Sequence, residues 1–173
     1  MMRLALTILL TPALVTGALA QASLEAPLRP LTTSVYPGVL EFEADHAELG
    51  ELGWHTELRM TRWPVPGVGL VELELTQVYP DFSNTKLFVD GVVRELDRGN
   101  QTLWKGQVAG DSAGSAWMSF SSTGCYGWFE VAGELFHMTS FAGPNNDWSH
   151  AGVRLYPEAL NHSVPGINPR EID

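Results

Sequence analysis

The sequence predicts an all-β domain, either an antiparallel β-sandwich or an open barrel built from meander hairpins. Apolar and polar residues alternate over short runs, which is the period of a strand with one buried face. Turn residues separate these runs at intervals of about ten residues. No long segment has the 3.6-residue period of an amphipathic helix. The chain has 173 residues, so we expect a single domain.

The N-terminus has the pattern of a secretory signal peptide over residues 1–20. Arg3 precedes an apolar run, and Ala18 to Ala20 form a small-x-small cleavage site. The run is too short and interrupted for a comfortable membrane span. The sequence therefore predicts a secreted protein, extracellular or periplasmic, with no membrane contact after cleavage. Residues 21–34 read as a polar, proline-broken lead-in.

The β-rich domain is expected over residues 35–141. Its first strand is predicted at 39–43, with the sequence VLEFE. The following residues suit one or two helical turns, and Gly50 and Gly53 limit their length.

From Trp54 onward the apolar period becomes two. In the run 55–63, Leu58 and Met60 share one face. The run 70–79 is the clearest strand, because three apolar residues alternate with three polar ones. These residues are Val71, Leu73 and Leu75 on one face and Glu72, Glu74 and Thr76 on the other. Such a strand places one face against a core and the other in water.

Six more strands are predicted before residue 142. Residues 86–96 form a hairpin signal, because Asp90-Gly91 suits a two-residue type I′ turn. Four short runs joined by tight turns then predict a meander, at 102–109, 114–121, 125–132 and 134–141. Residues 142–173 read as a Pro/Asn/Gly-rich tail, of which 152–160 suits one more strand or a short helical turn.

Charge and cysteine content exclude some functions. The net charge of −10 at pH 7 repels phosphate backbones and anionic headgroups, so nucleic acid is a poor partner. Cys125 is the single cysteine, so no internal disulfide is expected. A lone cysteine of this kind is more often buried and inert than reactive.

The sequence contains no recognisable catalytic or cofactor motif. There is no HExxH, nucleophile elbow, phosphate-binding loop or dinucleotide fingerprint. We therefore predict no catalytic residue, no metal site and no cofactor. The string GDSAGS around Asp111 lacks a glycine directly after the serine, so it reads as a β-turn rather than a protease nucleophile. His55 and Glu57 share a strand face, but zinc requires three or four ligands. A small hydrolase built on His55, Glu57 or His137 would need a pocket that joins at least two of them.

Three tryptophans fall on successive predicted strands, at Trp104, Trp117 and Trp128. Residues of this kind usually fill the core of a small β domain, and that is the expected location here. The alternative is an exposed aromatic platform in an extracellular carbohydrate- or ligand-binding module. Two or more of these side chains lying coplanar on an open face would favour the alternative, and burial between two sheets would count against it.

The segment 104–138 also has a recurring glycine pattern. It reads aromatic-x-Gly-x-Val-x-Gly-Asp, a strand ending in Ser, Gly-x-x-Gly, a further strand, and Gly-Glu-x-aromatic. The positions that carry it are Trp104, Gly106, Val108, Gly110, Asp111, Ser115, Ser119, Gly124, Gly127, Trp128, Gly133, Glu134 and Phe136.

This pattern resembles the propeptide domain of secreted zinc metalloproteases of the adamalysin/reprolysin type and their bacterial relatives, over about residues 87–139. The resemblance implies a non-catalytic domain that masks a metalloprotease active site or assists its folding, with a metalloprotease domain as partner. The two cysteines common in that family fall here on Thr102 and Ser122. Cys125 matches neither, so neither a disulfide nor an inhibitory zinc ligand is inferred. No protease domain follows in this sequence.

Overall fold

The computed structural model describes residues 22–31, 34, 36–81, 86–94, 100–143 and 147–161. The predicted signal peptide lies outside the described residues. The main-sheet strands are β1 (Ala22–Glu25), β2 (Leu28–Pro30), β3 (Leu40–Ala44), β4 (Glu57–Val65), β5 (Gly69–Val78), β8 (Thr102–Val108), β9 (Ala116–Ser121), β10 (Gly124–Val131), β11 (Glu134–Gly143) and β12 (Asp147–Pro157). A separate hairpin comprises β6 (Leu87–Val89) and β7 (Val92–Arg94), and the helices are α1 (His46–Glu51) and the 3-10 turns η1 (Leu52–Trp54) and η3 (Glu158–Leu160).

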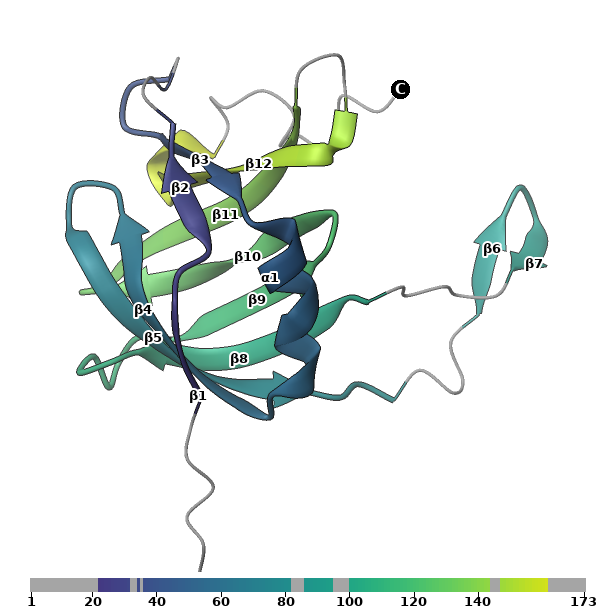
Figure 1. Cartoon of the computed structure of the whole chain (residues 1–173), viewed down its shortest axis with the longest axis horizontal. Coiled ribbons are helices and arrows are strands. Elements are labelled where there is room, and N and C mark those ends of the chain that lie inside the picture. Colours follow the sequence, from purple (N-terminus) through teal and green to yellow (C-terminus); the bar gives the residue numbers. More distant parts are fainter. Residues whose placement is uncertain are drawn as a thin grey trace, which may run out of the picture.

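Ten strands form one sheet that curls into a half-barrel (Figure 1). Their order is β1-β4-β5-β8-β9-β10-β11-β12-β3-β2. The all-β prediction is confirmed, with the open barrel as the form adopted. The predicted meander is also confirmed, because β8 to β11 pair consecutively in antiparallel ladders. The sheet is not purely antiparallel, since β1 runs parallel to β4.

One N-terminal stretch, residues 22–30, pairs with strands at both ends of the curled sheet. Its first part, β1, pairs with β4, and its second part, β2, pairs with β3. Between them, Ala26 N donates to Thr61 O at 2.9 Å, and Pro27 O accepts from Asp45 N at 2.9 Å. Proline suits this corner because it has no backbone N–H that would need a partner. We call residues 22–30 the bridging segment.

The sheet therefore extends beyond the expected limits of 35–141 at both ends. The bridging segment lies within the stretch interpreted as a lead-in, and β12 lies within the stretch interpreted as a tail. Both of the elements considered for 152–160 are present, since β12 is followed directly by η3. The bridging strands are very short and interrupted by proline, so they give little periodic signal.

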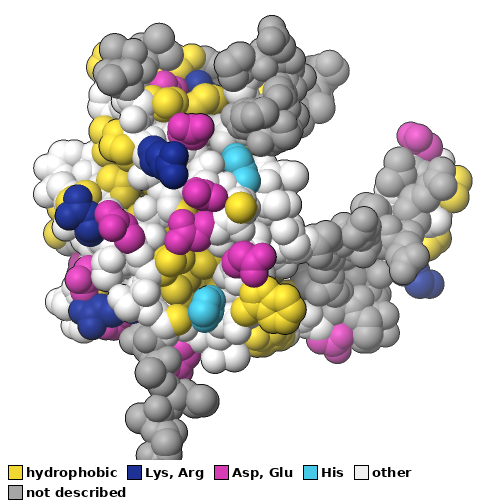
Figure 2. All heavy atoms as spheres, viewed as in Figure 1, with side chains coloured by type: hydrophobic (Ala, Val, Ile, Leu, Met, Phe, Trp, Pro, Cys, Tyr) yellow, Lys and Arg dark blue, Asp and Glu magenta, His cyan; other side chains and the backbone are white. Residues whose placement is uncertain are grey.

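The concave face of the sheet holds the hydrophobic core, and α1 packs across its mouth (Figure 1). Leu49 of α1 and Leu52 of η1 are fully buried in this core. Asp45 is the N-cap of α1, and its side chain accepts a hydrogen bond from Glu48 N at 3.1 Å. This agrees with the prediction of one or two helical turns. Figure 2 shows several acidic side chains on this face, in the region of α1.

An irregularity in β4 places Trp63 in the core. The register with β5 shifts between Met60 and Trp63, and Arg62 there has a φ of 56°. The extra residue changes which face later residues occupy, as a β-bulge does. Trp63 is consequently fully buried, with edge-on contacts to Phe120 and Phe129 at centroid distances of 6.4 and 6.3 Å.

The hairpin β6–β7 projects from the barrel (Figure 1). Asp90 and Gly91 have φ values of 53° and 76°. Two positive φ values at the central residues are those of a type I′ turn, so this prediction is confirmed.

A mostly buried ion pair joins the last strand to β3. Arg154 and Glu41 are direct cross-strand partners, and Arg154 Nε donates to Glu41 Oε1 at 2.7 Å. The guanidinium also lies 5.1 Å from the ring centroid of Tyr36 and 4.2 Å from that of Phe141. Arginine suits this place because its planar group can stack and hydrogen-bond at the same time.

We predict that Arg154→Ala lowers the free energy of unfolding by about 3 kcal/mol, because it leaves the buried Glu41 carboxylate without its partner. Arg154→Lys should give an intermediate loss, since it keeps the charge but not the planar stacking. Urea denaturation measures both. Arg59→Ala is the matched control, because it breaks a solvent-exposed pair with Glu72 and should cost much less. Equal losses at the two sites would contradict the importance of the buried pair.

Candidate functional site

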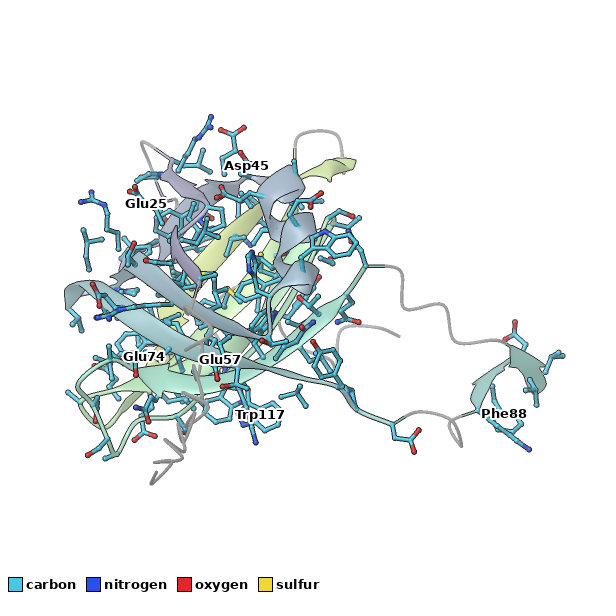
Figure 3. All side chains as sticks on the ribbon, turned by 60° about the horizontal axis from the view of Figure 1, so that its bottom comes forward. Glu25, Asp45, Glu57, Glu74, Phe88 and Trp117 are labelled. Atoms are coloured by element: carbon cyan, nitrogen blue, oxygen red, sulfur yellow. The ribbon has the colours of Figure 1, made fainter. Side chains whose placement is uncertain are left out.

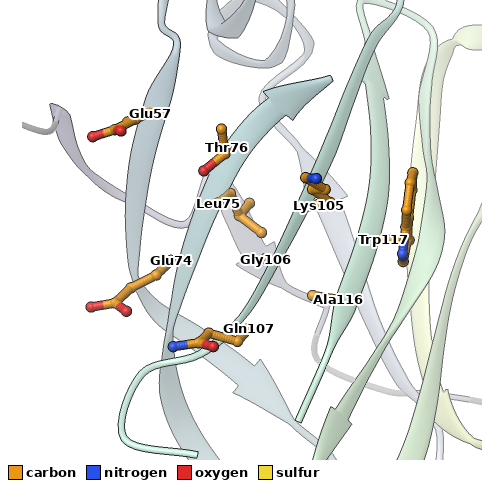
Figure 4. A pocket seen from close by; sticks show the side chains of 9 residues that line it. All are labelled: Glu57, Glu74, Leu75, Thr76, Lys105, Gly106, Gln107, Ala116 and Trp117. Carbon is orange, nitrogen blue, oxygen red and sulfur yellow. The ribbon is translucent and has the colours of Figure 1, made fainter. Parts of the chain in front are cut away.

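A groove of about 520 Å³ lies on the outer face of the barrel, across β4, β5, β8 and β9 (Figure 4). We call it the outer groove. Its lining residues are Glu57, Glu74, Leu75, Thr76, Lys105, Gly106, Gln107, Ala116 and Trp117. Figure 3 shows Glu57, Glu74 and Trp117 on the same side of the molecule.

Strand register explains why these residues meet. Thr76 pairs with Glu57 on one side and with Lys105 on the other, and Lys105 pairs with Trp117. Directly opposed residues of antiparallel strands point to the same face. Four residues from four strands therefore form one row, which runs across the strands.

The polar groups of the outer groove are available to a ligand. Within the described part of the chain, Glu57, Lys105 and Gln107 make no side-chain hydrogen bond or ion pair. The two carboxylates, Glu57 and Glu74, outweigh the single ammonium group of Lys105. The groove therefore offers both donors and acceptors, and its net charge disfavours an anionic ligand.

Two glycines of the recurring pattern allow strands to approach closely beside the groove. A Cβ at Gly106 would lie 1.8 Å from the backbone oxygen of Glu74. A Cβ at Gly127 would lie 2.2 Å from the backbone oxygen of Trp117. No side chain fits at either place, so close strand packing accounts for both glycines.

Of the other glycines in the pattern, two lie in turns and one lies close to the side chain of a neighbouring strand. Gly110 and Gly133 are turn residues with φ values of 82° and 79°. Gly124 begins β10, where an added Cβ would lie 2.7 Å from Ser140 Oγ.

The three tryptophans lie on opposite faces of the sheet. Trp104 is fully buried, and its Nε1 donates to Thr102 Oγ1 at 2.9 Å, so the expected core location is confirmed for it. Trp117 is 45% exposed, so that expectation is wrong here. Trp128 pairs directly with Trp117 on the outer face and is half-buried.

The alternation of side-chain direction along each strand explains why the tryptophans lie on different faces. Met118 and Phe129 are buried, so the residues directly before them in their strands must face outward. The outward direction of Trp117 and Trp128 could have been inferred from the apolar residues next to them in sequence. The tryptophans themselves did not indicate it, because an aromatic residue fits either face of a strand.

Asp111 connects two turns at one end of the barrel. Its Oδ1 accepts hydrogen bonds from Ala113 N and Gly114 N, both at 3.2 Å. Its Oδ2 accepts from Ala132 N at 2.9 Å, in the turn between β10 and β11. These bonds lower the pKa of Asp111, with the Ala132 bond as the largest cause. The prediction that this string is a turn is confirmed.

The remaining candidates of the sequence do not come together. Cys125 is fully buried, and burial raises the pKa of its thiol to about 12, as expected of an inert cysteine. Glu57 lines the outer groove without His55 or His137. His137 instead pairs with Glu158 and stacks on Tyr156.

No metal or membrane feature emerges from the part of the chain that the structure describes. Over those residues, no three His, Cys, Asp or Glu side chains are placed to hold a metal ion. Over the same residues, no helix has the length and apolar character needed to span a bilayer.

Comparison of the chain with protein-family models, with curated proteins and with solved structures gave no match. The resemblance to metalloprotease propeptides therefore stays a prediction.

We predict that Asp111→Asn destabilises the protein at pH 7, and that its deficit shrinks on acidification. A carboxylate with a lowered pKa stabilises the fold above its unfolded pKa, and this contribution disappears as the pH falls through the folded value. Melting temperatures of both proteins, measured from pH 7 down to below about pH 4, should therefore converge.

Glu134→Gln is the matched control for this measurement. Glu134 has an exposed carboxylate at the start of β11, and its side chain makes no hydrogen bond within the described residues. A constant difference between Asp111→Asn and wild type over the whole pH range would contradict the role assigned to Asp111.

Proposed function

We propose that this protein is an exported, non-catalytic binding module whose outer groove takes a neutral saccharide. The observation that carries the proposal is the exposed indole of Trp117 beside unpaired donors and acceptors. Ligand sites commonly combine an apolar or aromatic surface with a few convergent polar groups.

The chemistry of the groove suits sugar hydroxyls. The C–H face of a sugar ring can pack on an exposed indole, which supplies a large, flat apolar surface. Each hydroxyl both donates and accepts, so it needs a mixed set of partners. Thr76 and Gln107 offer both roles, while Lys105 donates and the two carboxylates accept.

Binding is favoured over hydrolysis. Glu57 and Glu74 line an open groove at the surface. A glycosidase acid instead lies in an apolar pocket that keeps it protonated.

We predict that Trp117→Ala strongly weakens saccharide binding, because Trp117 is the one aromatic side chain among the described residues that line the outer groove. Backbone amide NMR, with cellobiose, maltose, mannobiose and chitobiose as probes, should show shifts at Lys105 and Gln107 in wild type. Trp54→Ala is the matched control, since Trp54 is 83% exposed but lies on η1, outside the groove. Wild-type spectra that none of these sugars, nor their longer oligomers, perturbs at the groove would rule the proposal out.

A second proposal is that the protein binds a metalloprotease, as the resemblance implies. The observation that favours it is the projecting hairpin, which lies within the segment that carries the resemblance. Phe88 and Val93 are exposed cross-strand partners and so present one apolar face to solvent. Figure 3 shows Phe88 on this hairpin. Exposed apolar patches often mark protein interfaces.

The expected result is that the full chain slows peptide hydrolysis by a secreted adamalysin-type metalloprotease or raises its refolding yield. Phe88→Ser with Val93→Ser should remove the effect, because it makes the apolar face of the hairpin polar. Val92→Ser tests the neighbouring exposed position of the same hairpin and should retain most of the effect. Unchanged protease activity and refolding with the wild-type chain would count against this partner.

A further inference from the structure

We propose that the ligand is a linear oligosaccharide of several units, which extends from the outer groove over Trp128 to His137. This inference rests on the saccharide-binding function proposed above. It assigns a second binding segment, on β10 and β11, that lies beyond the residues lining the groove.

The first support is the continuation of the row across the sheet. Trp117 pairs with Trp128, and Trp128 pairs with His137. These side chains therefore point to the same outer face as Lys105, which pairs with Trp117. Neighbouring strands are about 4.8 Å apart, so the row from Lys105 to His137 spans about 14 Å. This length exceeds that of a single sugar ring.

The second support is the character of the side chains on both sides of this row. Tyr126 lies two residues before Trp128 on the same outer face and is exposed, which widens the aromatic surface. Its cross-strand partner Ser119 lies beside it. On the other side, Gln107 and Glu130 each lie two residues beyond a member of the row. The aromatic row is thus flanked by groups that can bind hydroxyls.

The third support is that the row ends at a defined place. The next cross-strand partner is Tyr156, which is fully buried beneath a small outer cluster that includes Tyr36 and Leu160. The ring of His137 stacks on Tyr156 at a centroid distance of 5.6 Å, and its Nε2 pairs with Glu158 of η3. A ligand that follows the row therefore stops at His137.

Isothermal titration calorimetry with two oligosaccharide series, from cellobiose to cellohexaose and from maltose to maltohexaose, tests the inference. In the series that binds, wild-type affinity should rise about tenfold from the disaccharide to the hexasaccharide. Trp128→Ala should lower the affinity for the hexasaccharide by about three- to tenfold, the range expected for the loss of one aromatic contact. It should leave the disaccharide unchanged, because the disaccharide occupies only the outer groove.

Three further variants make the result specific. Trp128→Phe keeps an aromatic surface and should retain most of the length dependence, which separates loss of contact from loss of folding. Trp117→Ala should weaken short and long ligands together. Trp54→Ala should change neither, and circular dichroism checks that each variant is folded.

The outcomes separate the two proposals. A disaccharide that binds as tightly as the hexasaccharide, or a Trp128→Ala variant that weakens both equally, overturns the extended site and leaves the groove as the binding site. Absence of binding by every member of both series, and by mannobiose, chitobiose and their longer oligomers, overturns the saccharide function and the extended site with it.

Discussion

Each backbone donor and acceptor at the edge of a sheet needs a partner, and the bridging segment supplies partners at both ends of this one. Because β1 pairs with β4 and β2 pairs with β3, the curled sheet has a continuous inner face. That face is filled by the core and sealed by α1. A ligand is therefore left with the outer face, and the outer groove lies there.

The same alternation of side chains that builds the core also builds the candidate site. Every inward residue of β8, β9 and β10 fixes the direction of its neighbours, so Trp104 and Trp117 have opposite environments. Gly106 allows β8 to come close to β5, because any side chain at position 106 would clash with the backbone of Glu74. The groove thus depends on strand register and on close strand packing, without requiring a dedicated loop.

Local signals in the sequence were sufficient for much of the fold. The strands β4, β5 and β8 to β11, the type I′ turn at Asp90-Gly91 and the turn at Asp111 all follow from short-range patterns. The bridging segment could not be predicted in this way, because its strands have only 4 and 3 residues and the partner of Ala22 is Leu58, well beyond any local pattern. The bulge that turns Trp63 inward also breaks the period locally. The outer groove needed the register of four strands, which no single strand pattern contains.

The position of the bridging segment also has a kinetic consequence. The partners of β1 and β2 come later in the chain, and β3 is itself held by β12 near the other end. The pairing of β3 with β12 can therefore form only after β12 has been synthesised. Contacts between such distant segments raise the relative contact order, which slows folding. The N-terminal strands can pair with β3 and β4 early, but β3 lacks its other neighbour until β12 is present, so the concave core is completed last.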